Sequence, residues 1–231
     1  KADQYVAVFG LEDADTNLQM ANQRINQRIE RFIQDLVASG IPRNQITVDM
    51  TTQNKLYDFK IQKDYAEEYL AGFQIMKNVI IGFNDLKKTE SMILIAAKYG
   101  IFDLVKVDYV LSDPQSVYLK LFEAATEVIE QKKELYVKAT KAILKPNSQI
   151  YGESFQCISP NQLYDSYSPS ENAIYLNSGK EFKQKIIPKS TTYYYDRIHY
   201  SGYDRVIQPV ITEPGLTYTL SLQIKFELKT R

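Results

Sequence analysis

The stretch "LTYTLSLQIKFEL", residues 216–228, alternates between apolar and polar side chains along its whole length. Its even-numbered positions are all apolar, and the odd-numbered positions between them are all polar. Because successive side chains of a β-strand point to opposite faces, this period of two predicts a strand with one buried and one solvated face. At about 3.3 Å per residue the strand would be about 43 Å long, roughly twice the usual length.

A strand of that length needs long partners. Residues 46–62 and 69–83 supply two long segments of strand character, joined by the polar residues 63–68. We therefore expect a hairpin that lies with the closing strand in one antiparallel-rich sheet. The outer half of the hairpin carries exposed apolar residues such as Tyr57 and Phe59, which predicts contact with a covering segment or a second subunit.

The first hundred residues contain the same order of elements twice. A strand at 4–10, a helix at about 16–39 and a strand at 45–50 are followed by a strand at 78–83, a helix at about 84–99 and a strand at 104–110. Two β-α-β units in tandem give the β-α-β-β-α-β order of a split, ferredoxin-like sheet with the helices on one face. The sequence therefore predicts an α+β fold.

The apolar residues of the first helix recur at spacings of three and four, which is the period of one buried helical face. They are Leu18, Ala21, Ile25, Ile29, Phe32, Ile33 and Leu36. Thr16 is the expected N-cap, with Gln19 three residues later. Arg24, Arg28 and Arg31 fall outside the apolar stripe, so we expect them on a solvated face. In the second helix Leu86, Ile93 and Ala97 are expected to face inward.

A third, longer helix is predicted at about 113–142, with Ser112 as its N-cap and Pro114 in its first turn. Its expected buried face consists of Val117, Leu121, Ala124, Val128, Leu135, Ala139 and Ile143. The charged stretch "EQKKE" at 130–134 interrupts this face, which indicates a section that borders solvent or a partner subunit.

The composition excludes several classes of protein. Lys plus Arg and Asp plus Glu both number 28, so the chain lacks the basic excess that is typical of nucleic-acid-binding proteins. No apolar run approaches the roughly 20 residues of a membrane-spanning helix. The single cysteine, Cys157, permits no internal disulfide, and we expect a small buried side chain rather than a nucleophile. The chain begins at Lys1 without Met, which predicts removal of a signal peptide or another leader.

Motifs of catalysis and cofactor binding are not found in the sequence. With one histidine the chain cannot form a two-histidine metal site, and it contains no GxSxG, P-loop or GxGxxG motif. Acidic pairs such as Glu67–Glu68 occur where solvated loops are expected, and nothing selects one of them for glycosidase-like chemistry. We therefore expect no enzyme activity, no catalytic residues, no metal and no cofactor.

The stretch "YYYDRIHYSGYDR", residues 193–205, gathers five tyrosines and the only histidine of the chain. Tyrosine offers a large rigid contact area with a hydroxyl at its tip, which suits recognition of sugars or proteins. The candidate ligand-binding residues are Tyr193, Tyr195, Arg197, His199, Tyr200 and Tyr203. The alternation of the stretch is equally typical of a lid on a sheet or of a subunit interface, and this structural role is the favoured interpretation.

Taken together, these segments resemble the SIMPL domain family, also called DUF541. The resemblance is carried by "YVAVFG" (5–10), "RIERFIQDLVASGI" (28–41), "ITVDM" (46–50), the block from Gly72 to Ile101, "VDYVLSD" (107–113), the long third helix and "PGLTYTLSLQIKFEL" (214–228). Two features depart from the family pattern. The chain has "LEDADT" (11–16) where the family usually has Pro-Asp-x-Ala, and residues 160–205 are unusually long and rich in tyrosine.

The resemblance implies a single SIMPL-like domain over residues 1–231, with a tyrosine-rich insertion at 161–205. It also implies an exported protein of the bacterial envelope, periplasmic or associated with the outer membrane, and some members assemble into rings. It supplies no catalytic residues. We therefore expect a non-enzymatic, homo-oligomeric scaffold or interaction protein. The alternative is a carbohydrate- or peptide-binding protein that uses the insertion.

Overall fold

The computed structural model describes residues 1–167, 191–208 and 213–229, without the side chains of Met50 and Thr51. The chain divides into two compact units, Lys1–Ser112 and Asp113–Arg231. Each unit is described here by itself, and the single domain over the whole chain stays a prediction. Within the expected insertion, residues 168–190 lie outside the described residues.

The first unit has the predicted α+β order. It contains β1 (Gln4–Asp15), α1 (Leu18–Ala38), a short 3-10 helix (Arg43–Gln45), β2 (Ile46–Gln62), β3 (Tyr65–Phe83), α2 (Lys88–Lys98) and β4 (Asp103–Val110). The four strands form one sheet in the order β2-β3-β1-β4, and every neighbouring pair is antiparallel. The β-α-β-β-α-β order and its split sheet are therefore confirmed.

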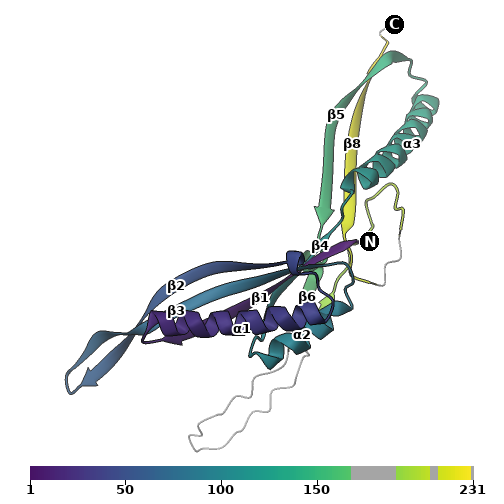
Figure 1. The fold of residues 1–231 in the computed structure, drawn as a ribbon. Helices are drawn as coiled ribbons and strands as arrows, with labels where there is room; N and C mark the ends of the chain where they lie inside the picture. The colour runs from purple at the N-terminus through teal and green to yellow at the C-terminus, as the bar shows by residue number, and fades with distance from the viewer. Residues whose placement is uncertain (168–190, 209–212, 230–231) are drawn as a thin grey trace, which may run out of the picture. The chain divides into compact units, whose positions relative to one another are not determined.

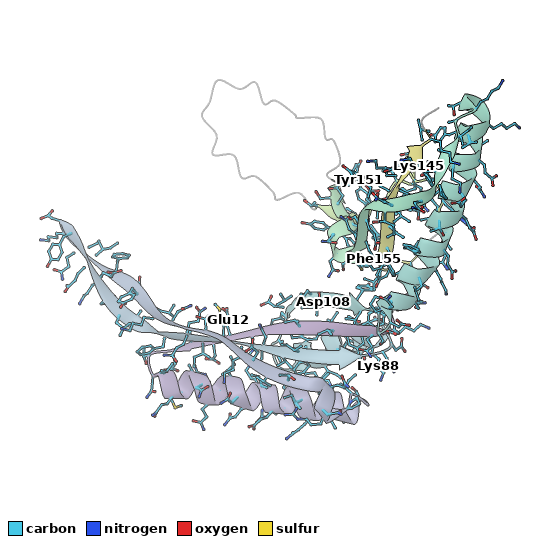
Figure 2. All side chains as sticks on the ribbon, turned by 90° about the horizontal axis from the view of Figure 1, so that it is seen from above. Glu12, Lys88, Asp108, Lys145, Tyr151 and Phe155 are labelled. Carbon is cyan, nitrogen blue, oxygen red and sulfur yellow. The ribbon has the colours of Figure 1, made fainter. Side chains whose placement is uncertain are left out.

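The core of this unit lies between the sheet and α1. The buried side chains of α1 are Ala21, Ile25, Ile29, Phe32, Ile33 and Leu36, six of the seven that the spacing predicted. Phe32 meets Phe9 of β1 edge to face, with ring centroids 5.5 Å apart. Both α1 and α2 cover the same face of the sheet (Figure 1). The opposite face is more polar, and Figure 2 shows Glu12 and Asp108 on it.

The inward face of α2 differs from the prediction. Met92 and Ala96 are the buried residues of this helix, whereas Leu86, Ile93 and Ala97 are exposed. Leu86 precedes the helix, which begins at Lys88. The run from Met92 to Ala97 is apolar at every position, so periodicity alone could not identify the side that packs.

The sequence had suggested that the arginines of α1 lie on a solvated face. This expectation is wrong for two of the three. Arg24 forms ion pairs with Asp13 at 2.7 Å and Asp15 at 2.6 Å, at the end of β1. The Arg28 guanidinium donates hydrogen bonds to the carbonyls of Glu12 (3.0 Å), Tyr99 (3.0 Å) and Gly100 (2.7 Å). Arg28 thereby ties α1 to β1 and to the turn after α2, and only Arg31 remains exposed.

The hairpin of β2 and β3 extends beyond the rest of the sheet (Figure 1). The last pair between β1 and β3 is Asp15 with Phe73, whereas β2 and β3 stay paired as far as Gln62 with Tyr65. Among the described residues, the outer part of the hairpin is therefore a ribbon of two strands with no third strand beside it. This projecting half was predicted from the sequence.

The second unit contains α3 (Pro114–Thr140), β5 (Leu144–Ile158), a short 3-10 helix (Pro160–Leu163), β6 (Tyr164–Tyr167), β7 (Thr192–Tyr195) and β8 (Thr217–Leu228). The closing strand β8 pairs with β5 in a separate two-stranded sheet. The expectation that it lies in the main sheet beside the hairpin is therefore wrong. The sequence did not identify β5 as its partner, because Pro146, Gly152 and two register shifts break the periodicity of β5.

The alternation of β8 sets which side of the β5–β8 ribbon is covered. Its even-numbered side chains from Leu220 to Phe226 are half-buried, and the odd-numbered ones between them are exposed. Phe155 of β5 packs edge to face with Tyr118 of α3 at 5.3 Å and stacks on Tyr218 at 5.6 Å. The apolar face is thus covered by α3 but not sealed, because one helix cannot enclose a ribbon of two strands. Cys157 is likewise exposed, contrary to expectation.

Replacement of Arg28 by Met tests the link that this arginine makes between three elements. Loss of three charge-assisted hydrogen bonds leaves backbone carbonyls without their partner, and we expect a loss of about 2–4 kcal/mol in the free energy of unfolding. The matched control is Arg31→Met, an exposed arginine on the next turn of α1, which should change stability by less than about 0.5 kcal/mol. Chemical denaturation measures both. Equal losses in the two variants would contradict the assigned role.

Candidate functional site

The predicted tyrosine-rich stretch begins as one strand of a small ribbon. β7 pairs antiparallel with β6, and the register places Tyr195 opposite Tyr164, Tyr194 opposite Asp165, and Tyr193 opposite Ser166. We call β6 and β7 the tyrosine ribbon. The rings of Tyr164 and Tyr195 meet edge to face at 5.8 Å. Tyr193 lies two residues from Tyr195 and so shares its face.

The six predicted binding residues lie along this strand and the loop that follows it. Tyr195 and Tyr200 are half-buried, while Tyr193, Arg197, His199 and Tyr203 are exposed. Tyr193 and Tyr195 share one face of the strand, whereas the other four lie on the loop. Tyr200 and Tyr203 bound a turn that is closed by a hydrogen bond from the Tyr203 amide to the Tyr200 carbonyl (3.2 Å). Their role as a ligand-binding set stays a prediction.

Tyr194 is a potential site residue that the prediction left out. Its phenol faces Asp165 across the strands, and the negative charge of that carboxylate raises the pKa of Tyr194. Desolvation and the charge of Asp196 raise the pKa further. The hydroxyl therefore stays protonated beyond the ordinary range of tyrosine, and it offers a donor beside two carboxylates.

The end of the tyrosine-rich stretch is fixed to α3 by two ion pairs. Lys132 pairs with Asp204, and Glu127 pairs with Arg205. At 100° per residue, Glu127 lies about 180° around α3 from Tyr118, which packs on the β5–β8 ribbon, whereas Lys132 lies only about 40° from Tyr118. The ion pairs of residues 204 and 205 therefore reach two different sides of the helix. Such exposed ion pairs contribute little to the free energy of unfolding. Their main effect is on the orientation of the loop.

The face of α3 that was predicted to be buried is covered over only part of its length. Val117, Leu121, Ala124 and Val128 are half-buried. Leu135 is 65% exposed and Ala139 is exposed. Ile143 lies beyond the end of the helix at Thr140 and is 64% exposed. The prediction is therefore wrong for the last turns, where even Tyr136, which lies in line with Tyr118 around the helix, is 67% exposed.

A second exposed surface lies on the outer part of the β2–β3 hairpin. Tyr57, Phe59 and Ile61 alternate along β2, so they share one face, and the register adds Leu70 opposite Tyr57 and Ala66 opposite Ile61. We call these five residues the hairpin face. Their large side chains are between 47% and 86% exposed.

The hairpin face continues the face of the sheet that α1 covers. Lys77 of β3 donates hydrogen bonds to Asn22 (3.0 Å) and Asn26 (2.6 Å) of α1, so its face of the sheet is the helix-covered one. Phe73 has the same parity on β3 and pairs with Lys55, which lies two residues before Tyr57 on β2. The hairpin face is therefore a core-type face that reaches beyond the N-terminus of α1.

Comparison with protein families matches residues 1–227 to the SIMPL family, described as "Protein of unknown function (DUF541)". The chain belongs to the SIMPL family. The match spans both units, so the family resemblance that the sequence suggested is confirmed. A search of the curated proteins finds no match for the chain.

Burial is distributed unevenly between the two units of this SIMPL protein. All described buried apolar side chains lie between Ala2 and Ile101, in the first unit. In the described part of the chain from Asp113 onward, Pro160 is the one buried residue. The second unit therefore has a half-covered apolar surface where the first has a core.

The described residues of this SIMPL protein contain no group of three or more His, Cys, Asp or Glu side chains placed to hold a metal ion. None of the helices in the described ranges combines the length and apolar character of a membrane span.

Proposed function

We propose that this SIMPL protein is an exported, non-enzymatic component of the bacterial envelope, and that copies of it assemble into a scaffold. The observation that carries the self-assembly is that the described residues of the second unit do not form a buried core. A helix on a two-stranded ribbon, with every described apolar side chain except Pro160 at least partly exposed, leaves apolar surface that a further contact would bury.

The energetics of β-ribbons and of apolar burial support contact between the exposed surface of the second unit and another copy. A two-stranded ribbon is marginal in water without a third strand or a well-packed helix. The exposed large apolar side chains of the unit include Leu135, Tyr136, Ile143, Ile150 and Leu228. Burial of apolar surface contributes about 25 cal/mol per Å², so contact with another copy would stabilise the unit.

The remaining parts of the proposal have different support. The envelope location rests on the family resemblance. The absence of enzyme activity rests on the lack of catalytic motifs in the sequence and on a family that is described as one of unknown function.

Light scattering and thermal unfolding over a range of protein concentration test the self-assembly. We expect particles heavier than one chain at tens of micromolar, the range in which weak interfaces begin to be populated. Because association stabilises the folded state by mass action, the melting temperature should rise with concentration. A chain that stays monomeric and melts at one temperature throughout would contradict the proposal.

A second candidate function is binding of a carbohydrate or a peptide by the tyrosine ribbon. The observation that favours it is the exposure of tyrosines on both faces: Tyr164 and Tyr193 on one, Tyr167 and Tyr194 on the other. Exposed aromatic anchors on a rigid strand are typical of recognition surfaces.

Replacement of Tyr193 by Ala tests this candidate, since its side chain is 69% exposed and its loss should not affect folding. Screening against arrays of oligosaccharides and of peptides identifies a ligand, and Tyr193→Ala should weaken its binding by about 2 kcal/mol, roughly thirtyfold. The matched control is Tyr136→Ala on α3, with a tyrosine that is 67% exposed. Binding that is unchanged in Tyr193→Ala, or absent from both arrays, would reject the candidate.

A further inference from the structure

The hairpin face is a core-type surface without the helix that covers the rest of its side of the sheet. Ile61 at its outer end is 86% exposed, and Phe59 is 58% exposed. Given about 150–250 Å² for each large aromatic side chain, the face leaves on the order of 400 Å² of apolar surface in contact with water. An exposed apolar patch of that size on a soluble protein marks an interaction site.

The complementary element for such a face is an amphipathic helix, as α1 shows on the same side of the sheet. The last two turns of α3 offer one. Leu135 and Ala139 lie four residues apart on these turns and are both exposed, and Lys138 lies beside them. We call these three residues the helix end. Leu135 is 65% exposed.

The charges of the two surfaces are opposite in sign. Residues 57–70 carry four carboxylates and two lysines, a net charge of −2. Residues 131–141 carry four lysines and one glutamate, a net charge of +3, although Lys132 and Lys133 are already paired with Asp204 and Glu130. Glu68 lies opposite Phe59 on the same side of the ribbon as the hairpin face, and Lys138 lies within the helix end. Contact between the hairpins of two copies would instead bring like charges together, which disfavours it.

We infer that the hairpin face of one copy binds the helix end of a second copy. This inference rests on the self-assembly proposed above and specifies its contact. The interface is heterologous, since each copy uses two different surfaces. A pair of copies therefore keeps one free hairpin and one free helix end, and assembly proceeds beyond the dimer.

Two single substitutions each remove one side of this contact. Ile61→Lys adds a positive charge to the hairpin face, and Leu135→Glu adds a negative charge to the helix end. Both sites are largely exposed, so both variants should fold, which circular dichroism and thermal unfolding verify. The matched control for the first is Gln62→Lys on the opposite face of the ribbon. The control for the second is Leu119→Glu, 53% exposed near the other end of α3.

Size-exclusion chromatography with light scattering gives the mass of each variant at concentrations where the unaltered chain associates. We expect Ile61→Lys and Leu135→Glu to be monomeric, and both controls to associate like the unaltered chain. An unaltered chain that is itself monomeric overturns the proposed self-assembly and this inference together. Association that persists in either test variant overturns this inference alone.

Mixing the two variants decides whether the contact is heterologous. Ile61→Lys retains an intact helix end and Leu135→Glu retains an intact hairpin face, so one good interface forms between them. An equimolar mixture should therefore associate into dimers or larger particles, whereas each variant alone stays monomeric. A mixture that stays monomeric would overturn the head-to-tail contact.

Discussion

The packing of α1 on the sheet determines how much of this protein is buried. The length of α1 limits how much of the sheet this packing can cover. A helix of 21 residues is about 32 Å long, whereas a strand of 19 residues such as β3 spans about 63 Å. One helix can therefore cover only about half of the sheet along β3. The covered half contains the buried side chains of Phe9 and Val79, with Phe9 packed against Phe32 of α1, and the uncovered half is the hairpin that carries Phe59 and Ile61.

In the second unit the sheet beneath the helix is narrow, although its length is sufficient. Its helix α3, of 27 residues, and its strand β8, of 12 residues, are both about 40 Å long, so they match in length. The sheet beneath the helix has only two strands, however, and a ribbon of that width leaves the edges of the apolar face open. Side chains such as Ile224 and Phe226 are therefore half-buried, although their alternation is regular. The short helix of the first unit and the narrow sheet of the second unit account for the exposed apolar surface at the hairpin face and the helix end. Both surfaces favour contact with further copies, which would bury them.

Much of this fold could be predicted from the sequence because local patterns were strong. The stripe from Ala21 to Leu36 identified α1 and its buried face, and the order of strands and helices identified the split sheet. The caps were displaced by one residue, Asn17 in place of Thr16 and Asp113 in place of Ser112, because either neighbour can accept the amide hydrogen bond. The partner of β8 was not predictable, since pairing is a long-range choice and β5 lacks a regular period. The exposed surfaces were only partly predicted: the sequence indicated the projecting hairpin, but not the exposure of the last turns of α3.

The central claim is that the first unit is stable by its own core while the second depends on contacts between copies. Hydrogen exchange of backbone amides at several protein concentrations tests it most directly, since protection reports the stability of each region. The account predicts that protection in β1 and α1 does not depend on concentration. It also predicts that protection in α3, in β8 and in the outer part of the β2–β3 hairpin rises as the protein associates. Equal and concentration-independent protection in both units would contradict the account.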